Sequence, residues 1–384
     1  MTTVEPTDAA TIDAAPFTAA SVNAAPPHYV LGPATRLLWR SPDSVHLELG
    51  SRAVVVDGLP ARVISRVAAP PTARLKADRR AGRQRAEPPP DPEPVVEAPV
   101  AEVLLDLADA GFLWTRAAPA ADDADHPIDS VDDRLIPPSP RLAGELTSLA
   151  ARHGDRAAEL LDARRHACVM VYGGGRTAAH LAALLAAAGV GRVHCASAGS
   201  VRLCHLVPGG VQPRDEGLAL AAAADAAIRR AAPDADTTPL SVGDSPDLTV
   251  LAVDAPIDET RRAALHAAGA AHLVVAVGVD HGVIGPLVVP GLTSCLRCAD
   301  LHRRDRDPAW SALAAQLTID GRYGPSSDVA VDTTIVGSAV IQVLTFLDGG
   351  DPACIEGTLE LHLPDWRLRR RSWPIHTDCG CCGE

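Results

Sequence analysis

Apolar and polar residues alternate strictly over residues 45–49, and this pattern predicts a β-strand with one buried face. Residues 36–40 and 53–56 on either side also have strand character. A Gly-Ser pair at 50–51 can turn the chain, so we expect a hairpin over 45–56. A closing strand is expected at 112–114.

Two further segments of this region repeat their apolar residues at the spacing of a helix. The first begins at Pro60 and carries Val63, Ile64 and Val67 on one face. The second is expected to end at Gly111, because glycine readily adopts the left-handed conformation that ends helices. Its apolar face consists of Val100, Val103, Leu104 and Leu107. Strands and helices of this size favour a winged-helix, α+β domain over residues 28–116.

Three polar segments interrupt the pattern. Residues 1–27 are rich in Ala, Pro and Thr, residues 69–94 combine a basic cluster with many prolines, and residues 117–140 are acidic and Pro-rich. Such segments bury too little apolar surface to fold. We therefore expect disorder at 1–27 and 69–94 and a linker at 117–140. The alternative for 69–94 is a contact with nucleic acid or an acidic partner.

From residue 141 to residue 384 the pattern predicts an α/β domain, which opens with a helix near 141–164. Helices are then expected at 177–188, 215–232, 258–268, 300–317 and 331–347. Strands are expected at 166–172, 192–197, 248–254, 272–279, 283–289, 356–363 and 367–373. Strands that alternate with helices are typical of a parallel, doubly wound, Rossmann-like sheet.

Composition narrows the class of protein. The net charge of −13 argues against nucleic-acid binding. We expect no membrane partner, since no apolar run is expected to reach the roughly 18–20 residues of a span. The N-terminus lacks the charged start and apolar stretch of a secretory signal, so a cytoplasmic location is expected. The nine cysteines are then expected to be metal ligands or buried thiols rather than disulfides.

Two Cys-x-x-Cys pairs predict a zinc site, in which each pair supplies two thiolates from a tight turn. The predicted ligands are Cys295, Cys298, Cys379 and Cys382. Four thiolates leave no open position for a substrate, so the zinc would be structural. The alternative is a set of reduced thiols in a flexible tail, and Cys381 is a rival ligand whose role the sequence leaves open.

A glycine turn follows the strand at 166–172, where the amides of Gly173 and Gly175 could approach a phosphate at a helix N-terminus. The alternative is that these glycines only allow the strand and the helix to pack closely. In dinucleotide-binding enzymes an acidic residue ends the next strand and holds a ribose. Ser197 occupies that position, which disfavours a nicotinamide-dependent oxidoreductase. Asp254, which ends a later strand, is the best candidate for a polar contact with a ligand.

The segment 302–307 combines a histidine with three arginines and two aspartates directly before the helix expected from Pro308. Its dense charge is most simply explained as a solvated helix cap. The alternative is that its arginines contact a peptide or a phosphate.

Two stretches, Val171-Tyr-Gly-Gly-Gly-Arg-Thr-Ala178 and Ala187-Ala-Gly-Val-Gly-Arg-Val193, resemble the opening of the ThiF/MoeB-type, ubiquitin-activating-like adenylyltransferases. The segments 290–298 and 379–383 look like the zinc knuckles of that superfamily. The resemblance covers about residues 160–384. A winged-helix domain before a ThiF-like domain is also similar to azole-forming cyclodehydratases of ribosomal peptide biosynthesis, as is the run 296–310.

The resemblance places different residues at the positions that handle ATP. Active members use a GxGGxG turn, whose fourth and sixth positions fall here on Arg176 and Ala178. The ribose-holding Asp falls on Ser197 and the phosphate-binding Lys falls on Leu220. The magnesium-holding Asp falls on Ile257.

Stabilising a phosphoryl centre requires fixed cations and a metal ion. The only lysine is Lys76, in the segment expected to be disordered, and the remaining candidate cations are Arg176, Arg192 and Arg214. We therefore expect structural zinc, no adenylation and at most a weak ATP–Mg site. The residues of that weak site would be Gly173, Gly175, Arg176, Ser197 and Asp254.

The resemblance implies a scaffold that presents a precursor peptide to an ATP-using, YcaO-type partner enzyme, and homodimers are common in the superfamily. The leader peptide would add a strand beside the hairpin at 45–56, with Val54 and Val56 or their alternates lining the groove. The alternative is an active adenylyltransferase that acts on the C-terminus of a peptide or a sulfur carrier.

Overall fold

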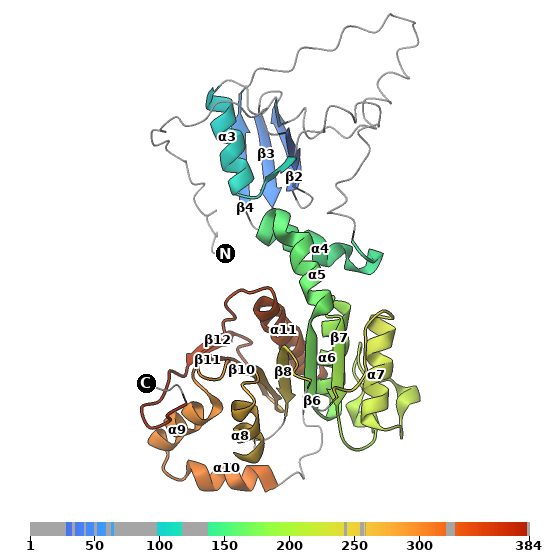
Figure 1. Ribbon diagram of the computed structural model, residues 1–384, viewed down its shortest axis with the longest axis vertical. Coiled ribbons are helices and arrows are strands. Elements are labelled where there is room, and N and C mark those ends of the chain that lie inside the picture. Colours follow the sequence, from blue (N-terminus) through green and yellow to red (C-terminus); the bar gives the residue numbers. More distant parts are fainter. Residues whose placement is uncertain are drawn as a thin grey trace, which may run out of the picture. The chain divides into compact units, whose positions relative to one another are not determined.

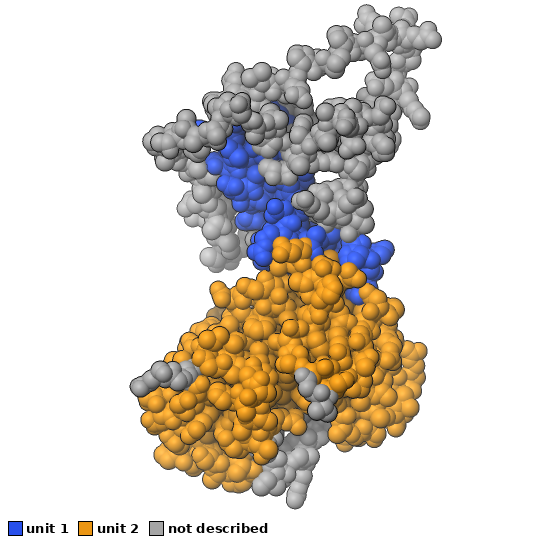
Figure 2. Space-filling model, viewed as in Figure 1, with its two compact units in different colours: residues 1–158 blue, residues 159–384 orange. Residues whose placement is uncertain are grey.

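The computed structural model describes residues 28–32, 35–41, 44–49, 52–58, 63–64, 98–116, 137–241, 244–253, 257, 259–319 and 327–381. The chain divides into two compact units, residues 1–158 and 159–384, and each is described by itself (Figures 1 and 2). The segments 1–27 and 69–94 and most of 117–140 lie outside the described residues. The disorder and the linker expected there stay predictions.

A three-stranded antiparallel sheet forms the N-terminal unit's core layer, in the order β2-β3-β4. The strands are β2 (Thr35–Ser41), β3 (Ser44–Leu49) and β4 (Arg52–Asp57). The predicted hairpin is confirmed as β3-β4, in which Val45 lies opposite Val56 and Leu47 opposite Val54. The alternation in β3 buries Val45, Leu47 and Leu49 on one face of the sheet.

One helix, α3 (Ala98–Asp109), supplies the other half of this core. Its Val100, Leu104 and Leu107 are buried with the inner face of the sheet. The chain leaves the helix through Gly111, whose φ of 82° confirms the predicted stop. The closing strand β5 (Leu113–Arg116) then pairs with β1 (His28–Leu31) in a separate two-stranded ladder. Only residues 63–64 of the helix expected after Pro60 are described.

The single helix expected at 141–164 is two helices, α4 (Ala143–His153) and α5 (Ala157–His166). Gly154 separates them with a φ of 60°, a conformation that no α-helix contains. The expectation of one continuous helix was therefore wrong. The two compact units divide at residues 158 and 159, so that α4 groups with the N-terminal unit.

A seven-stranded sheet forms the centre of the C-terminal unit, in the order β12-β11-β10-β9-β8-β6-β7. The parallel strands are β6 (Cys168–Gly173), β7 (Arg192–Ala196), β8 (Leu248–Ala252) and β9 (His272–Val277). The antiparallel strands are β10 (His281–Val288), β11 (Gly357–His362) and β12 (Leu368–Ser372).

The expectation of a purely parallel sheet was correct only for the half that contains β6 to β9. Residues 278–280 alone connect β9 to β10, whereas a parallel connection needs about a dozen residues or more. The chain must therefore reverse at that point, and the sheet is mixed.

Helices cover both faces of this sheet. Along β8, Val250 and Ala252 pack into the core with α6 (Gly175–Ala187), α7 (Leu220–Ala231) and α11 (Val329–Leu347). Leu251 points to the other face, which carries α8 (Glu259–Ala267), α9 (Leu296–Arg306) and α10 (Trp310–Ile319). The expected helix at 300–317 is interrupted between α9 and α10, because Pro308 holds the preceding Asp307 in an extended conformation.

The helix α11 corrects one expectation, since it is long and apolar enough by composition to cross a membrane. Its buried residues include Val331, Ile335 and Val343, and they pack into the core of the sheet. Core helices commonly have this composition, and the packing of α11 accounts for its apolar character.

Candidate functional site

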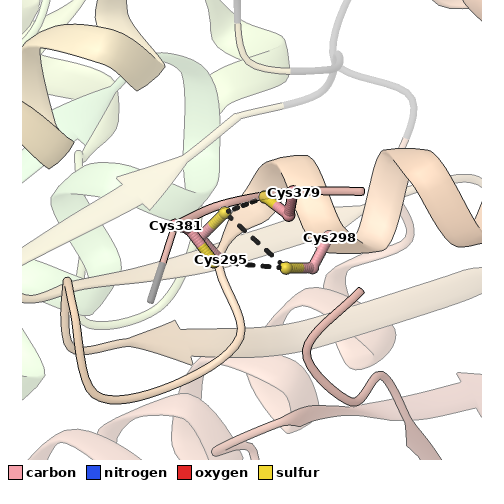
Figure 3. A group of neighbouring side chains, drawn as sticks. All are labelled: Cys295, Cys298, Cys379 and Cys381. Atoms are coloured by element: carbon pink, nitrogen blue, oxygen red, sulfur yellow. Dashed lines mark hydrogen bonds between the residues drawn. The ribbon is translucent and has the colours of Figure 1, made fainter. Parts of the chain in front are cut away.

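Four cysteine side chains from two distant segments meet at one point of the C-terminal unit (Figure 3). They are Cys295, Cys298, Cys379 and Cys381, and their sulfur atoms all lie within 4.8 Å of one another. Cys295 Sγ lies 3.5 Å from Cys379 Sγ and 3.9 Å from Cys298 Sγ. Cys298 Sγ lies 3.4 Å from Cys381 Sγ.

These separations suit the ligands of a single zinc ion. With Zn–S bonds of about 2.3 Å, the ligands of a tetrahedral site lie roughly 3.8 Å apart. Four thiolates at this distance would repel one another, and a divalent cation at their centre removes that cost. The donor set is therefore compatible with zinc, and four sulfur ligands would leave no open position for a reacting molecule.

Local backbone geometry brings each pair of sulfurs together. Cys295 is the extended residue directly before α9, and Cys298 follows in the first turn of that helix. In the tail, Gly380 has a φ of 64°, which lets the chain turn between Cys379 and Cys381. The backbone amide of His376 donates to Cys298 Sγ at 3.3 Å, so the tail is also held by a hydrogen bond.

Within the described residues, the fourth sulfur of the cluster is that of Cys381. The sequence spacing pointed to Cys382, which lies outside the described residues, so its assignment stays a prediction. The structure places Cys381 beside Cys298 instead. Because Cys381 and Cys382 are neighbours in the chain, only the path of the tail decides which of them reaches the cluster.

A hydrogen-bonded histidine, which the sequence did not single out, supports the tail. His376 Nδ1 accepts from the amide of Asp378 at 3.1 Å. Its Nε2 therefore carries the proton and donates to Asp305 Oδ2 at 2.7 Å. This bond lowers the pKa of the Asp305 carboxyl. A protonated Nε2 cannot ligate a metal, so we interpret this group, which also includes His302, as a clasp between α9 and the tail.

Burial and hydrogen bonding shift the pKa values of the thiols in the cluster in opposite directions. Burial raises the pKa of Cys295 and of Cys379. Burial also acts on Cys298, but hydrogen bonds, first among them the His376 amide, outweigh it and lower the pKa of this thiol. Metal ligation requires the deprotonated form, so binding must release protons.

The three glycines of the turn between β6 and α6 differ in their surroundings. A Cβ atom at Gly173 would lie 2.0 Å from the carbonyl oxygen of Ala252, so this glycine is required for close packing against β8. A Cβ atom at Gly174 or Gly175 would meet nothing within 4 Å. The alternative explanation of tight packing therefore holds for Gly173, whereas the N-terminus of α6 faces open space.

Two residues that could contact a nucleotide are already hydrogen-bonded inside the protein. Arg176 Nη1 donates to the carbonyl of Ser327 at 2.7 Å, and Nη2 donates to the carbonyl of Cys204 at 3.0 Å. The hydroxyl of Ser197 donates to the carbonyl of Gly173. The first turn of α6 is anchored in the same way, because Thr177 Oγ1 donates to the fully buried Asp332 at 2.6 Å.

The other residues considered for nucleotide binding lie away from phosphate-binding positions or outside the described residues. Leu220 is buried in the core at the start of α7. Arg192 begins β7, at the end of the sheet opposite the glycine turn, and its side chain donates to the carbonyls of Thr238 and Pro239. Asp254 lies outside the described residues. Ile257 packs against the apolar residues around the cysteines.

No protein-family model matches the chain, and no curated protein matches it significantly. Solved structures do match its fold. Escherichia coli MccB with an isoasparagine form of MccA has a TM-score of 0.66 at 14% identity, over 93% of this chain and 99% of MccB. Escherichia coli MccB with ATP has a TM-score of 0.62 at 15% identity, over 92% and 99%.

A heterocyclase in complex with substrate and cofactor has a TM-score of 0.53 at 16% identity. It is matched over 93% of this chain and 40% of its own length. Identities this low establish the fold alone. The chain thus has the fold of MccB, a microcin C7 biosynthetic enzyme, including the mixed sheet. This agrees with the fold implied by the ThiF-type resemblance.

Proposed function

We propose that this protein binds a precursor peptide, acts with an ATP-using, YcaO-type partner enzyme in peptide modification, and does not itself adenylate. The observation that carries the proposal is that residues at the nucleotide-handling positions already interact with other parts of the protein. Arg176 and Ser197 are hydrogen-bonded to backbone carbonyls, and Leu220 is a core residue.

The chemistry of phosphoryl transfer gives this observation its weight. Catalysis depends on cations and metal ions fixed around the phosphates before the reaction begins. Both Nη atoms of Arg176 already donate to backbone carbonyls, so either atom would have to break a hydrogen bond to donate to a phosphate instead. A leucine at position 220 contributes no positive charge. The four-cysteine site, with all its positions filled by sulfur, would stabilise the unit rather than react.

The peptide-binding part of the proposal draws on the N-terminal unit. Both β2 and β4 are edge strands of its sheet, and an extended peptide can add to such an edge. Val54 and Val56 pack toward the core, so the alternate Val55, which is 40% exposed, is a β4 side chain available to a ligand. MccB has been crystallised with MccA, and the heterocyclase structure is a complex with substrate and cofactor.

The alternative function is an active adenylyltransferase on a peptide or sulfur-carrier C-terminus. It is favoured by the open N-terminus of α6 at Gly174 and Gly175, since helix N-termini attract phosphates. MccB, which shares the fold, has been crystallised with ATP.

Peptide selection combined with edge-strand variants tests the proposal. Peptides selected from a random library on the purified protein should slow hydrogen exchange of β4 amides, and Val55→Asp should weaken their binding by about tenfold or more. Leu38→Asp, on the other edge strand and 48% exposed, is the matched control and should have little effect. The proposal fails if no peptide is captured, or if captured peptides leave β4 unprotected.

A further inference from the structure

An apolar pocket opens on the face of the seven-stranded sheet that carries α9. It encloses about 310 Å³, which is within the usual range for small-molecule and side-chain pockets. Its apolar lining includes Val253, Val274, Ala276, Val283, Leu296 and Ala299. The walls therefore come from the carboxyl end of β8, from β9 and β10, and from α9, all within the C-terminal unit.

The polar lining of the pocket consists of His281, Asp300, Arg303 and Trp310. Asp300 Oδ1 accepts from Arg303 Nη1 at 3.1 Å and from Trp310 Nε1 at 3.2 Å. Its Oδ2 accepts from Arg262 Nη1 at 2.7 Å. The carboxylate is thus surrounded by donors of the protein itself, and its negative charge is offset by two guanidinium groups.

Arg303 also belongs to a cluster of arginines around a buried indole. The guanidinium carbons of Arg303, Arg306 and Arg371 lie 5.1, 4.9 and 5.7 Å from the ring centroid of Trp373, which is 2% exposed. Arg303 pairs with Asp300, and Arg371 pairs with Glu360 at 3.2 Å. Among the described residues no carboxylate forms an ion pair with Arg306, which is exposed.

We propose that the pocket and this arginine cluster form a second peptide site, which takes an apolar side chain flanked by carboxylates. The proposal rests on the proposed function, because it assumes that the ligand is a peptide. The apolar walls favour an aliphatic or aromatic side chain, since burying it removes apolar surface from water. Carboxylates are the matching partners of guanidinium groups, with which they form bidentate pairs.

The distribution of charge in the chain indicates which charge the ligand carries. A net charge of −13 repels acidic peptides from most of the protein's surface. The three arginines around Trp373 place positive charge at one point of that surface. The sequence leaves two explanations for the segment 302–307, a solvated helix cap or a contact between its arginines and a peptide or a phosphate. The stacking of Arg303 and Arg306 on Trp373, beside an apolar pocket, supports a contact with a peptide.

Labelled ten-residue peptides with blocked ends test the proposal by fluorescence anisotropy on the full chain. The probe carries a central Phe flanked by Asp, and its two control peptides replace the Phe with Ser or the Asp with Lys. The probe should bind at least about tenfold more tightly than either control. Equal binding of the three peptides, or no binding of the probe, would overturn the site.

Variants of the protein locate the bound probe. Ala276→Leu fills the pocket and Arg306→Gln removes the positive charge of Arg306, and each should weaken binding by about tenfold. Arg165→Gln, an exposed arginine on α5, is the matched charge control and should bind the probe normally. Thermal melting and bound zinc show that each variant is folded. Unchanged affinity in folded Ala276→Leu, or displacement of the probe by ATP, would contradict the proposal.

The outcome is distinguishable from that of the proposed function. Val55→Asp lies in the other unit and should leave binding of the probe unchanged. If the probe binds while β4 captures no peptide, the edge-strand part of the proposed function fails and the pocket stands. If β4 captures peptides and the probe does not bind, only the second site is lost.

Discussion

The four-cysteine cluster and the glycine turn belong to the same α/β unit, yet the structure preserves them to different degrees. The cysteines keep the arrangement that a metal requires, with sulfur atoms from α9 and the tail within 4.8 Å. The glycine turn keeps its backbone shape, but Arg176 and Ser197 beside it are hydrogen-bonded to carbonyl oxygens of the protein.

The difference follows from what each site requires. A structural metal needs only ligand atoms at the right separation, and stability alone maintains them. A nucleotide site needs charged groups left without internal partners so that a ligand can use them. When catalysis is not required, such groups can form internal hydrogen bonds that stabilise the fold. We therefore expect the four-cysteine cluster to be a structural metal site and the glycine turn to be a packing feature.

Loss of a cysteine ligand should have the largest effect. Cys298→Ser should abolish stoichiometric zinc binding and cost on the order of 5 kcal/mol, because metal binding is coupled to folding. For a unit of this size, Tm should fall by roughly 10–20 °C, measured by calorimetry beside elemental analysis. Cys204→Ser, an exposed cysteine outside the cluster, is the control and should retain zinc.

The tail variants then decide the fourth ligand. Cys381→Ser should release zinc and Cys382→Ser should not, because Cys381 Sγ lies beside Cys298 Sγ. The opposite result would restore the pair predicted from the spacing of the sequence. Wild-type protein with less than one equivalent of zinc would contradict the four-cysteine zinc site altogether.

A buried carboxylate anchors the glycine-turn region, and its removal should have the next largest effect. Asp332 accepts from Thr177 Oγ1 at 2.6 Å and from His180 Nδ1 at 3.3 Å. Asp332→Ala leaves both groups without this acceptor and should cost roughly 2–4 kcal/mol, seen by urea unfolding. Thr333→Ala, its exposed neighbour, should be neutral. Equal stability of the two variants would show that the network contributes nothing.

Replacing Arg176 separates a structural role from a nucleotide-binding role. Arg176→Met removes two hydrogen bonds to carbonyls and should cost about 1–3 kcal/mol, with no change in the response to Mg-ATP. Arg165 forms an exposed ion pair with Asp162, which contributes little to stability. Arg165→Met therefore serves as the control. An unaltered free energy of unfolding together with a lost ATP response would reverse the assignment.

Thiol labelling gives the smallest expected effect. Burial raises the pKa of Cys195, beside Ser197, to about 11. Only about one thiol in a thousand is then ionised at pH 8, and this fraction rises about a hundredfold by pH 10. Mass spectrometry after brief alkylation at pH 8 should find the exposed Cys204 modified and Cys195 intact. Rapid labelling of Cys195 would show that the end of β7 opens readily.

Much of the architecture could be predicted because each strand and helix has its own apolar pattern. Alternation or helical spacing, together with glycine turns and stops, predicts the hairpin β3-β4, the helix α3 and the parallel strands. The reversal at β10 was missed, although the short connection 278–280 carried the signal. The break at Gly154 depends on a positive φ, which apolar spacing does not report.

The candidate sites were predicted in part for similar reasons. Spacing identified three cysteines of the cluster, but the choice between Cys381 and Cys382 depends on a tail that His376 and Asp305 position. The engagement of Arg176 could not be foreseen, since its acceptors at Ser327 and Cys204 are far away in the chain. The pocket beside Trp310 also combines residues of several separate elements.

Titration of the purified, zinc-loaded protein with Mg-ATP by calorimetry tests the central claim most directly. The account predicts no saturable binding up to about 1 mM, the upper end of ordinary enzyme KM values, and no exchange of pyrophosphate into ATP with any captured peptide. Saturable binding in the micromolar range, accompanied by such exchange, would contradict the account and establish an adenylating enzyme.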